Sequence, residues 1–97
     1  MEYSVDVSPP KGDFDPLPDE NNLSVALDVN GRIIFKGRPV SSEELTSTLK
    51  TMFAANPKLN ILLRADGSRP YDDVIDVMKH IKAAGIKNIS LVTQAED

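Results

Sequence analysis

Residues 62–93, LLRADGSRPYDDVIDVMKHIKAAGIKNISLVT, decide the fold of this 97-residue chain. They continue a compact apolar run, Leu59 to Asp66, which is more typical of a central strand than of a half-exposed one. An Asp-Gly turn follows, and the residues after Pro70 repeat with the period of a helix. Ile89 to Thr93 then forms a last strand. The stretch therefore predicts a strand, one helix and a second strand.

The helix after Pro70 has charges that suit its dipole. Acidic residues dominate its first turn and lysines follow in its second half, an order that the helix dipole favours. Gly85 is the expected left-handed residue after its last turn. Its predicted buried stripe comprises Tyr71, Val74, Ile75, Met78 and Ile81.

Upstream, two short apolar segments predict a hairpin whose register can be deduced. Leu23–Asp28 alternates, and Arg32–Lys36 follows after Val29-Asn30-Gly31. A two-residue Asn-Gly turn would mix polar and apolar side chains on each face. A three-residue loop with Gly31 in the left-handed bulge position keeps one face apolar, so we expect that register. It pairs Leu27 with Ile33, Val25 with Phe35 and Asp28 with Arg32.

A first helix is predicted between the hairpin and the central strand. Ser41 can cap it, with Glu44 reaching back from the third position. Asn56-Pro57 ends it. Its apolar face comprises Leu45, Leu49, Met52 and Phe53.

The element order is therefore β-β-α-β-α-β, and the predicted fold class is α+β. Each helix has a single apolar stripe, so we expect a two-layer fold, a four-stranded mixed sheet with both helices on one face. This domain extends over residues 23–97. One sheet face and the sheet edges remain available for pairing with another chain.

Residues 1–22 differ from the rest in composition. They hold six of the 15 acidic residues and four of the seven prolines, with Lys11 as their only base. Prolines remove amide donors and like charges repel, so we expect a flexible tether with little core of its own. The chain has a formal net charge of −4 and no basic stripe, which argues against a nucleic-acid partner.

The sequence holds no catalytic or metal constellation. It has no cysteine, and His80 is its only histidine, so we predict no metal site and no cofactor. Asp72 and Asp73 are adjacent and diverge on a helix, and Ser68 has no base nearby. We therefore expect no enzyme. A small hydrolase would need a buried acid or nucleophile in a cleft, and a carbohydrate-binding module would need exposed aromatic residues. No apolar run approaches the roughly 18 residues of a membrane span.

Arg64 and Asp66 flank Ala65 at the end of the central strand, so their side chains point to the same face. They can form an ion pair that clasps the turn into the next helix. Alternatively, they can contact a partner, and the sequence leaves both roles open.

The same segment resembles the periplasmic domain of the ExbD/TolR family. The matching residues are Arg64-Ala65-Asp66, Pro70-Tyr71, Val77-Met78, Ala84-Gly85 and Ser90-Leu91-Val92-Thr93. Near the start, residues 5–10 are similar to the family pattern Val-x-Val-x-Leu-Pro, except that Pro9 replaces leucine. The resemblance implies a non-enzymatic role in energy transduction. It also implies a periplasmic location, with a single inner-membrane helix preceding this chain in a Gram-negative bacterium.

The resemblance names two sets of partners. ExbD-type proteins work with an ExbB-type proton channel and pass proton-motive force to TonB, for import of iron-siderophores and vitamin B12. TolR-type proteins work with a TolQ-type channel in the Tol-Pal system, and their periplasmic domain is implicated in binding peptidoglycan. Arg64-Ala65-Asp66 and Leu91-Val92 look more like ExbD. Three segments also look like TolR: residues 55–58, Pro70-Tyr71-Asp72 and Thr93-Gln94. We favour ExbD, with TolR as the alternative.

The resemblance further implies a homodimer, and it points to the last strand as a functionally sensitive region. Tyr3 to Val7 alternates and can add to a sheet edge, although a solvated tether fits it equally well. Leu91 suits core packing and a partner interface equally. The partner-binding residues that we predict are Val5, Val7, Ser90, Leu91, Val92 and Thr93.

Overall fold

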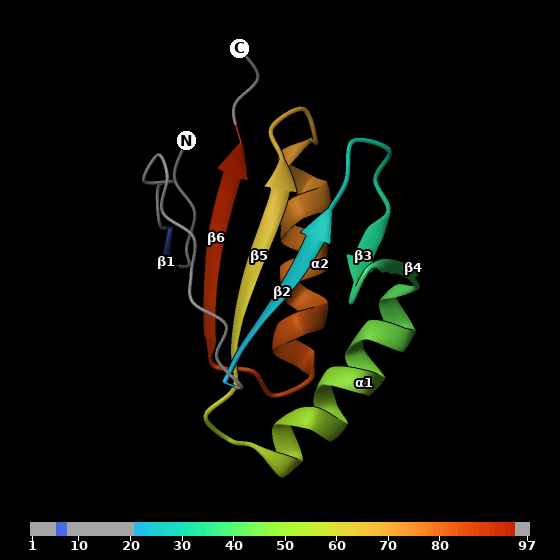
Figure 1. The fold of residues 1–97 in the computed structure, drawn as a ribbon. Coiled ribbons are helices and arrows are strands. Elements are labelled where there is room, and N and C mark those ends of the chain that lie inside the picture. Colours follow the sequence, from blue (N-terminus) through green and yellow to red (C-terminus); the bar gives the residue numbers. More distant parts are fainter. Residues whose placement is uncertain (1–5, 8–20, 95–97) are drawn as a thin grey trace.

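The computed structural model describes Asp6–Val7 and residues 21–94, and Figure 1 shows their arrangement. The architecture is α+β, with two helices on one face of a mixed sheet. The helices are α1 (Ser42–Ala55) and α2 (Tyr71–Ala83). The strands are β1 (Asp6–Val7), β2 (Asn22–Leu27), β3 (Ile33–Phe35), β4 (Arg38–Val40), β5 (Asn60–Asp66) and β6 (Asn88–Gln94).

The sheet has six strands in the order β1-β6-β5-β2-β3-β4, so the prediction of four strands is wrong. β1, β6, β5 and β2 run parallel, whereas the β2–β3 and β3–β4 pairs are antiparallel. The missed β4 follows a two-residue turn with Lys36 at φ 53° and Gly37 at φ 80°, the geometry of a type I′ hairpin. Pro39 in its centre hides the strand signal, because proline is rare inside sheets.

The other additional strand comes from the predicted tether. Residues 1–5 and 8–20 of that segment lie outside the described residues. Asp6–Val7 forms β1, and Asn22 already belongs to β2.

The predicted register of the first hairpin is confirmed. β2 and β3 pair Val25 with Phe35 and Leu27 with Ile33. Gly31 lies at φ 82°, a left-handed conformation that lets the chain reverse within three residues. The carboxylate of Asp28 pairs with Arg32 Nε at 2.9 Å, which closes the loop.

The core lies between the sheet and the two helices. Successive strand residues point to opposite faces, so alternate residues of β2, β5 and β6 face the helices. Burial of each large aliphatic side chain contributes about 1.5–3 kcal/mol, so this layer fixes the positions of the strands. The largest fully buried side chains are Val25, Leu45, Leu49, Ile61, Leu63, Ile81 and Leu91.

The helix ends agree with the sequence in part. Ser41 accepts a hydrogen bond from the N–H of Glu44 at 3.0 Å and so caps α1, but the Glu44 carboxylate pairs with Arg38 at 2.6 Å instead of reaching back. Tyr71 is 38% exposed, which corrects its place in the buried stripe: it begins α2, and the buried positions start one turn later at Val74. Gly85 is left-handed at φ 100°, as predicted.

Candidate partner-binding edge

The predicted partner-binding residues lie on β6 and on its neighbour β1, except for Val5, which lies outside the described residues. β6 pairs along its full length with β5, from Asn60 opposite Asn88 to Asp66 opposite Gln94. On its other side, the described residues of β1 form two pairs, Asp6 with Ser90 and Val7 with Leu91. Five of the seven β6 residues therefore have no described strand beside them on this edge.

The side chains of β6 point to two different surfaces. Leu91 is fully buried in the core beneath the helices, so only its main chain is available to an added strand. Ser90 and Val92 alternate with it and lie on the face opposite the helices. Thr93 is half-buried. The four predicted residues of β6 thus share one strand, but their side chains do not form one patch.

The opposite edge of the sheet, formed by β4, lacks a central hydrogen-bond donor. In a two-residue hairpin the residues that flank the turn exchange hydrogen bonds, so Phe35 pairs inward with Arg38, and Ile33 with Val40. The outward donor of this edge falls at Pro39, which has no N–H. Among the described strands, the edge that can template a new strand is therefore that of β6.

Two carboxylates at the ends of β2 and β5 are held by local turns. The pKa of Asp28 lies below its usual value, chiefly because the backbone N–H of Arg32 donates to it at 2.8 Å. The pKa of Asp66 is also lowered, chiefly by the hydroxyl of Ser68 and then by the Ser68 N–H. Ser68 therefore holds the turn after β5 and does not cap α2, whose N-cap residue is Pro70.

Arg64 and Asp66 do not form the ion pair that the sequence suggested. The carboxylate of Asp66 accepts from its own turn, because a local Asx-type turn competes well with a longer-range partner. Arg64 makes no ion pair or side-chain hydrogen bond within the part of the chain that the structure describes. Its exposed side chain lies on the face opposite the helices, with Ala26 and Val92 as cross-strand neighbours.

A second network, which sequence reasoning missed, ties the β2–β3 turn to the start of α2. Arg69 Nη1 donates to the carbonyl of Val29 at 2.9 Å, and its Nη2 pairs with Asp73. The guanidinium lies close to Gly31, where an added Cβ would be 3.3 Å from Nη2. The available signal was a cation just before a helix start, a position that the helix dipole disfavours unless another contact compensates.

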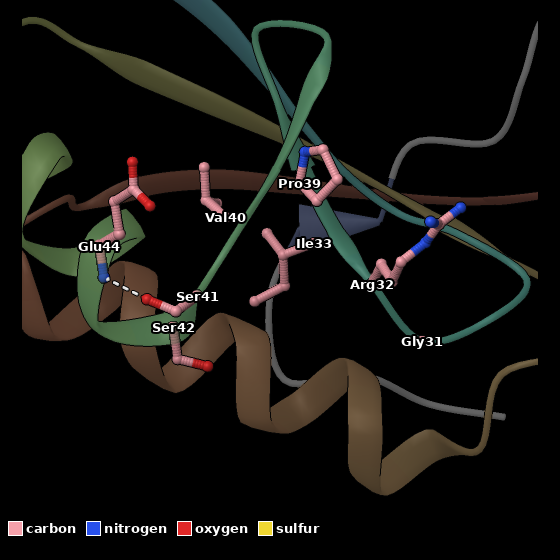
Figure 2. Close-up of a pocket in the computed structure, with 8 residues that line it drawn as sticks. All are labelled: Gly31, Arg32, Ile33, Pro39, Val40, Ser41, Ser42 and Glu44. Carbon is pink, nitrogen blue, oxygen red and sulfur yellow. Dashed lines mark hydrogen bonds between the residues drawn. The ribbon is translucent and has the colours of Figure 1, made fainter.

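A shallow depression of about 450 Å³ lies between the β3–β4 hairpin and the start of α1 (Figure 2). Its charged and hydroxyl groups already serve the fold: Ser41 caps the helix, and Glu44 pairs with Arg38. Among the described residues, no three His, Cys, Asp or Glu side chains come together as a metal site. The depression therefore offers contact surface without a reactive group. Its lining residues are Gly31, Arg32, Ile33, Pro39, Val40, Ser41, Ser42 and Glu44.

The whole chain is similar to proteins of a known family. The family described as "Biopolymer transport protein ExbD/TolR" matches residues 1–96, almost the whole chain. The chain belongs to the ExbD/TolR family.

This ExbD/TolR chain is similar to proteins named for both branches. It is 25% identical to the Tol-Pal system protein TolR of Pseudomonas aeruginosa, over 98% of this chain and 75% of the relative. It is 30% identical to a Synechocystis protein named for biopolymer transport and ExbD, over 75% of this chain but 27% of that protein. It is 33% identical to TolR of Escherichia coli K12, over 54% of this chain and 37% of the relative. The chain thus spans well under half of two of these three relatives.

The proteins of the ExbD/TolR family share a general role. They are non-enzymatic components of energy-transducing biopolymer transport, and they are anchored in the inner membrane with a periplasmic domain. They work within multi-protein complexes. In the described ranges of this chain, neither helix is long and apolar enough to cross a membrane.

Proposed function

We propose that this ExbD/TolR domain passes force from a proton-driven inner-membrane complex to a partner that adds as a strand to the β6 edge. The observation that supports this most directly is the contrast between the two sheet edges. Among the described residues, β1 pairs with β6 over two of the seven residues of β6, whereas β4 is interrupted by Pro39. Main-chain pairing then supplies affinity, and alternate side chains supply register.

Strand addition suits a link that must form and break. A hydrogen bond contributes a net of about 0.5–1.5 kcal/mol, so the two residue pairs of β1 are a modest barrier to displacement. A partner with a longer extended segment gains more pairs along β6 than the described residues of β1 provide. Ordering that segment costs about 2–5 kcal/mol, which keeps the affinity weak and the link reversible.

In the ExbD form of this proposal, the added strand is a periplasmic segment of a TonB-type protein. An ExbB-type channel contacts the membrane helix expected before this chain, and the complex serves import of iron-siderophores and vitamin B12. We also propose a homodimer that exchanges N-terminal segments, with β1 of one protomer pairing with β6 of its partner. The resemblance of residues 64–66 and of Leu91-Val92 favours this branch.

The TolR form of the proposal has a specific observation in its favour. The Pseudomonas aeruginosa relative, which aligns with 98% of this chain, is named for the Tol-Pal system. In this form the periplasmic ligand is peptidoglycan, and the work is done within a Tol-Pal complex.

An NMR titration separates the two forms. Isotope-labelled protein is titrated with an extended TonB periplasmic peptide and, separately, with soluble peptidoglycan fragments. Strand addition predicts that the peptide shifts the amides of residues 89–93 and leaves those of Arg38 and Val40 on β4 unchanged. A peptide of the same composition with proline at alternate positions is the control, because it cannot pair. Shifts from peptidoglycan alone would exclude the ExbD form.

Sedimentation of the full chain tests the homodimer. We expect self-association that strengthens with concentration and weakens when Val7 is replaced by proline. A chain that stays monomeric at millimolar concentration would contradict the exchanged dimer without affecting the peptide result.

A further inference from the structure

The two flanks of helix α2 have different neighbours. One flank lies toward α1 and the β2–β3 turn: the hydroxyl of Thr46 in α1 donates to the His80 carbonyl at 3.3 Å, and Asp73 pairs with Arg69 beside that turn. In Figure 1, α1 lies to the right of α2 and β6 lies to its left. The opposite flank, here called the α2 flank, therefore lies toward the β6 edge. It is a stripe of residues three or four positions apart: Tyr71, Ile75, Met78 and Lys82.

Most of the α2 flank is apolar. Met78 is buried, and Ile75 is half-buried where it packs against the core cluster. Tyr71, at the start of the helix, is 38% exposed. Ile75 is thus covered by the core on one side and accessible on another. An aliphatic side chain placed beside it would remove more apolar surface from water.

The last turn of α2 on this side is basic. Lys82 is exposed, and Lys79 and Lys87 are exposed near the same end of the helix. None of the three forms an ion pair within the described ranges of the chain. A carboxylate brought to this end of β6 would therefore meet lysines that are not already paired there.

The antiparallel course of α2 and β6 sets which parts lie level with each other. The chain descends through α2 and returns along β6, so Lys82 lies near the start of β6 and Tyr71 near its end. The seven positions from Lys82 to Ile75 rise about 10 Å, which equals about three strand residues. Lys82 is therefore nearest to Ile89, and Ile75 is nearest to Leu91.

A strand added beside β6 can reach this flank with alternate side chains. Ile89 and Leu91 both belong to the helix-side core, and residues opposite them on a neighbouring parallel strand point to the same face. The parallel pairing of β1 with β6 shows that this edge accepts a parallel neighbour. A parallel partner has its N-terminal end near Lys82.

We propose that the α2 flank selects the partner strand, and that it favours an extended segment of the form acidic-x-aliphatic. The acidic residue lies opposite Ile89 beside Lys82, and the aliphatic residue lies opposite Leu91 against Ile75. This inference rests on the proposed strand addition at the β6 edge and names the sequence that the edge prefers. An exposed ion pair contributes little affinity, but together with an apolar contact two residues away it fixes register and direction.

Three extended nine-residue peptides test the pattern. They have identical serine- and threonine-rich sequences except at the centre, which is Glu-x-Val, Lys-x-Val or Glu-x-Ala. In NMR titrations of the isotope-labelled full chain, the Glu-x-Val peptide should bind roughly two- to fivefold more tightly than the Lys-x-Val peptide. It should also bind several-fold more tightly than the Glu-x-Ala peptide, and its valine should give nuclear Overhauser effects to the Ile75 methyl groups. A nitroxide at its N-terminus should broaden the amide of Asn88 more than that of Thr93.

A charge reversal in the protein completes the test. Lys82→Glu should reverse the preference, so that the Lys-x-Val peptide binds more tightly than the Glu-x-Val peptide. Lys50→Glu is the matched control, because Lys50 is an exposed lysine of α1, and it should keep the wild-type preference. If all three peptides shift the amides of residues 89–93 with equal affinity, strand addition stands and the selection proposed here is overturned. If none of them shifts these amides, the strand addition itself fails.

Discussion

Replacing Arg69 by methionine should loosen the β2–β3 turn and destabilise the domain. The guanidinium joins two segments that are far apart in the sequence, through the Val29 carbonyl and the Asp73 carboxylate. The Arg69 side chain is 22% exposed, so these contacts are partly shielded from water. Methionine keeps much of the aliphatic stem and removes both polar contacts.

The expected magnitude follows from three contributions. A hydrogen bond from a charged donor contributes about 1.5–3 kcal/mol, which is the main loss. The pair with Asp73, whose side chain is 41% exposed, adds about 0–1 kcal/mol. Nε of Arg69 is buried without a hydrogen-bond partner among the described residues. Removing this unpaired group raises the free energy of unfolding by about 1 kcal/mol, which offsets part of the loss. The net loss is about 2 kcal/mol, which lowers the Tm by roughly 8–16 °C for a domain of this size.

Urea denaturation at pH 7 measures this loss, and amide exchange locates it. Exchange should accelerate at residues 28–32 more than in β5 or β6. Arg32→Met is the matched control, because Arg32 is 59% exposed and pairs within its own loop, so its loss should be below about 1 kcal/mol. The reasoning fails if both variants have the same stability, or if exchange in the turn is unchanged in Arg69→Met.

Three further results are expected. Leu91→Gln should lower the free energy of unfolding by about 2–5 kcal/mol in denaturant melts, because Leu91 is fully buried and an amide there lacks a partner; a variant of unchanged stability would mean that Leu91 is not core. The lowered pKa values of Asp28 and Asp66 stabilise the fold above the unfolded value of about 3.9, and this stability is lost as the pH falls through the folded values. Melts at a series of pH values should therefore decline more steeply below pH ~4 for the wild type than for Asp28→Asn with Asp66→Asn, and parallel curves would contradict this. Val7→Pro should tighten peptide binding at the β6 edge in the same NMR titration, because removing β1 leaves the binding-competent edge fully populated; weaker binding would show that β1 assists the partner.

The parts of the fold that were predicted correctly are those in which several local signals agree. The register of the first hairpin follows from the sequence because a slip of one residue would expose Leu27 and bury its polar neighbours. The left-handed Gly85 and the Ser41 cap each satisfy a need of the helix end itself. These features depend on neighbours within a few positions, so a single sequence contains enough information to predict them.

The parts that were missed depend on position within the sheet. Pro39 argues against a strand in general, and it is tolerated in β4 because β4 is an edge whose outward donor is not needed. The sequence does not reveal which strand will be at an edge, since that follows from the order of all strands. For the same reason, Lys36-Gly37 was not recognised as a hairpin turn, although its geometry is of type I′.

The sequence predicted the strand that contains the candidate site, but it did not predict which side chains of that strand are accessible to a partner. Leu91 suits a core and an interface equally in sequence, because both need an apolar residue, and only its place beneath the helices identifies it as core. Arg64 and Asp66 were correctly placed on one face of the sheet. The Asp66 carboxylate nevertheless accepts a hydrogen bond from the N–H of Ser68 in its own turn and does not pair with Arg64. The alternation of residues along a strand predicts the face on which a side chain lies. It does not predict the hydrogen-bond partner of that side chain, because the contact that orders the fewest residues costs the least chain entropy.

The two edges of the sheet differ in their ability to pair with an added strand, because, among the described strands, the β6 edge has unpaired main-chain groups and the β4 edge contains Pro39. In the proposed mode of binding, a strand added beside β6 extends the parallel half of the sheet and leaves the β4 hairpin unchanged, so we expect one partner strand for each domain. Because each additional pair contributes only a net of about 0.5–1.5 kcal/mol per hydrogen bond, the length of the added segment sets the strength of the link. The five β6 residues without a described neighbour on this edge limit that strength. A partner that is pulled along the strand axis loads these hydrogen bonds together, and it separates once they break. Under the proposed function, a short parallel edge of this kind transmits a limited force and then releases its partner.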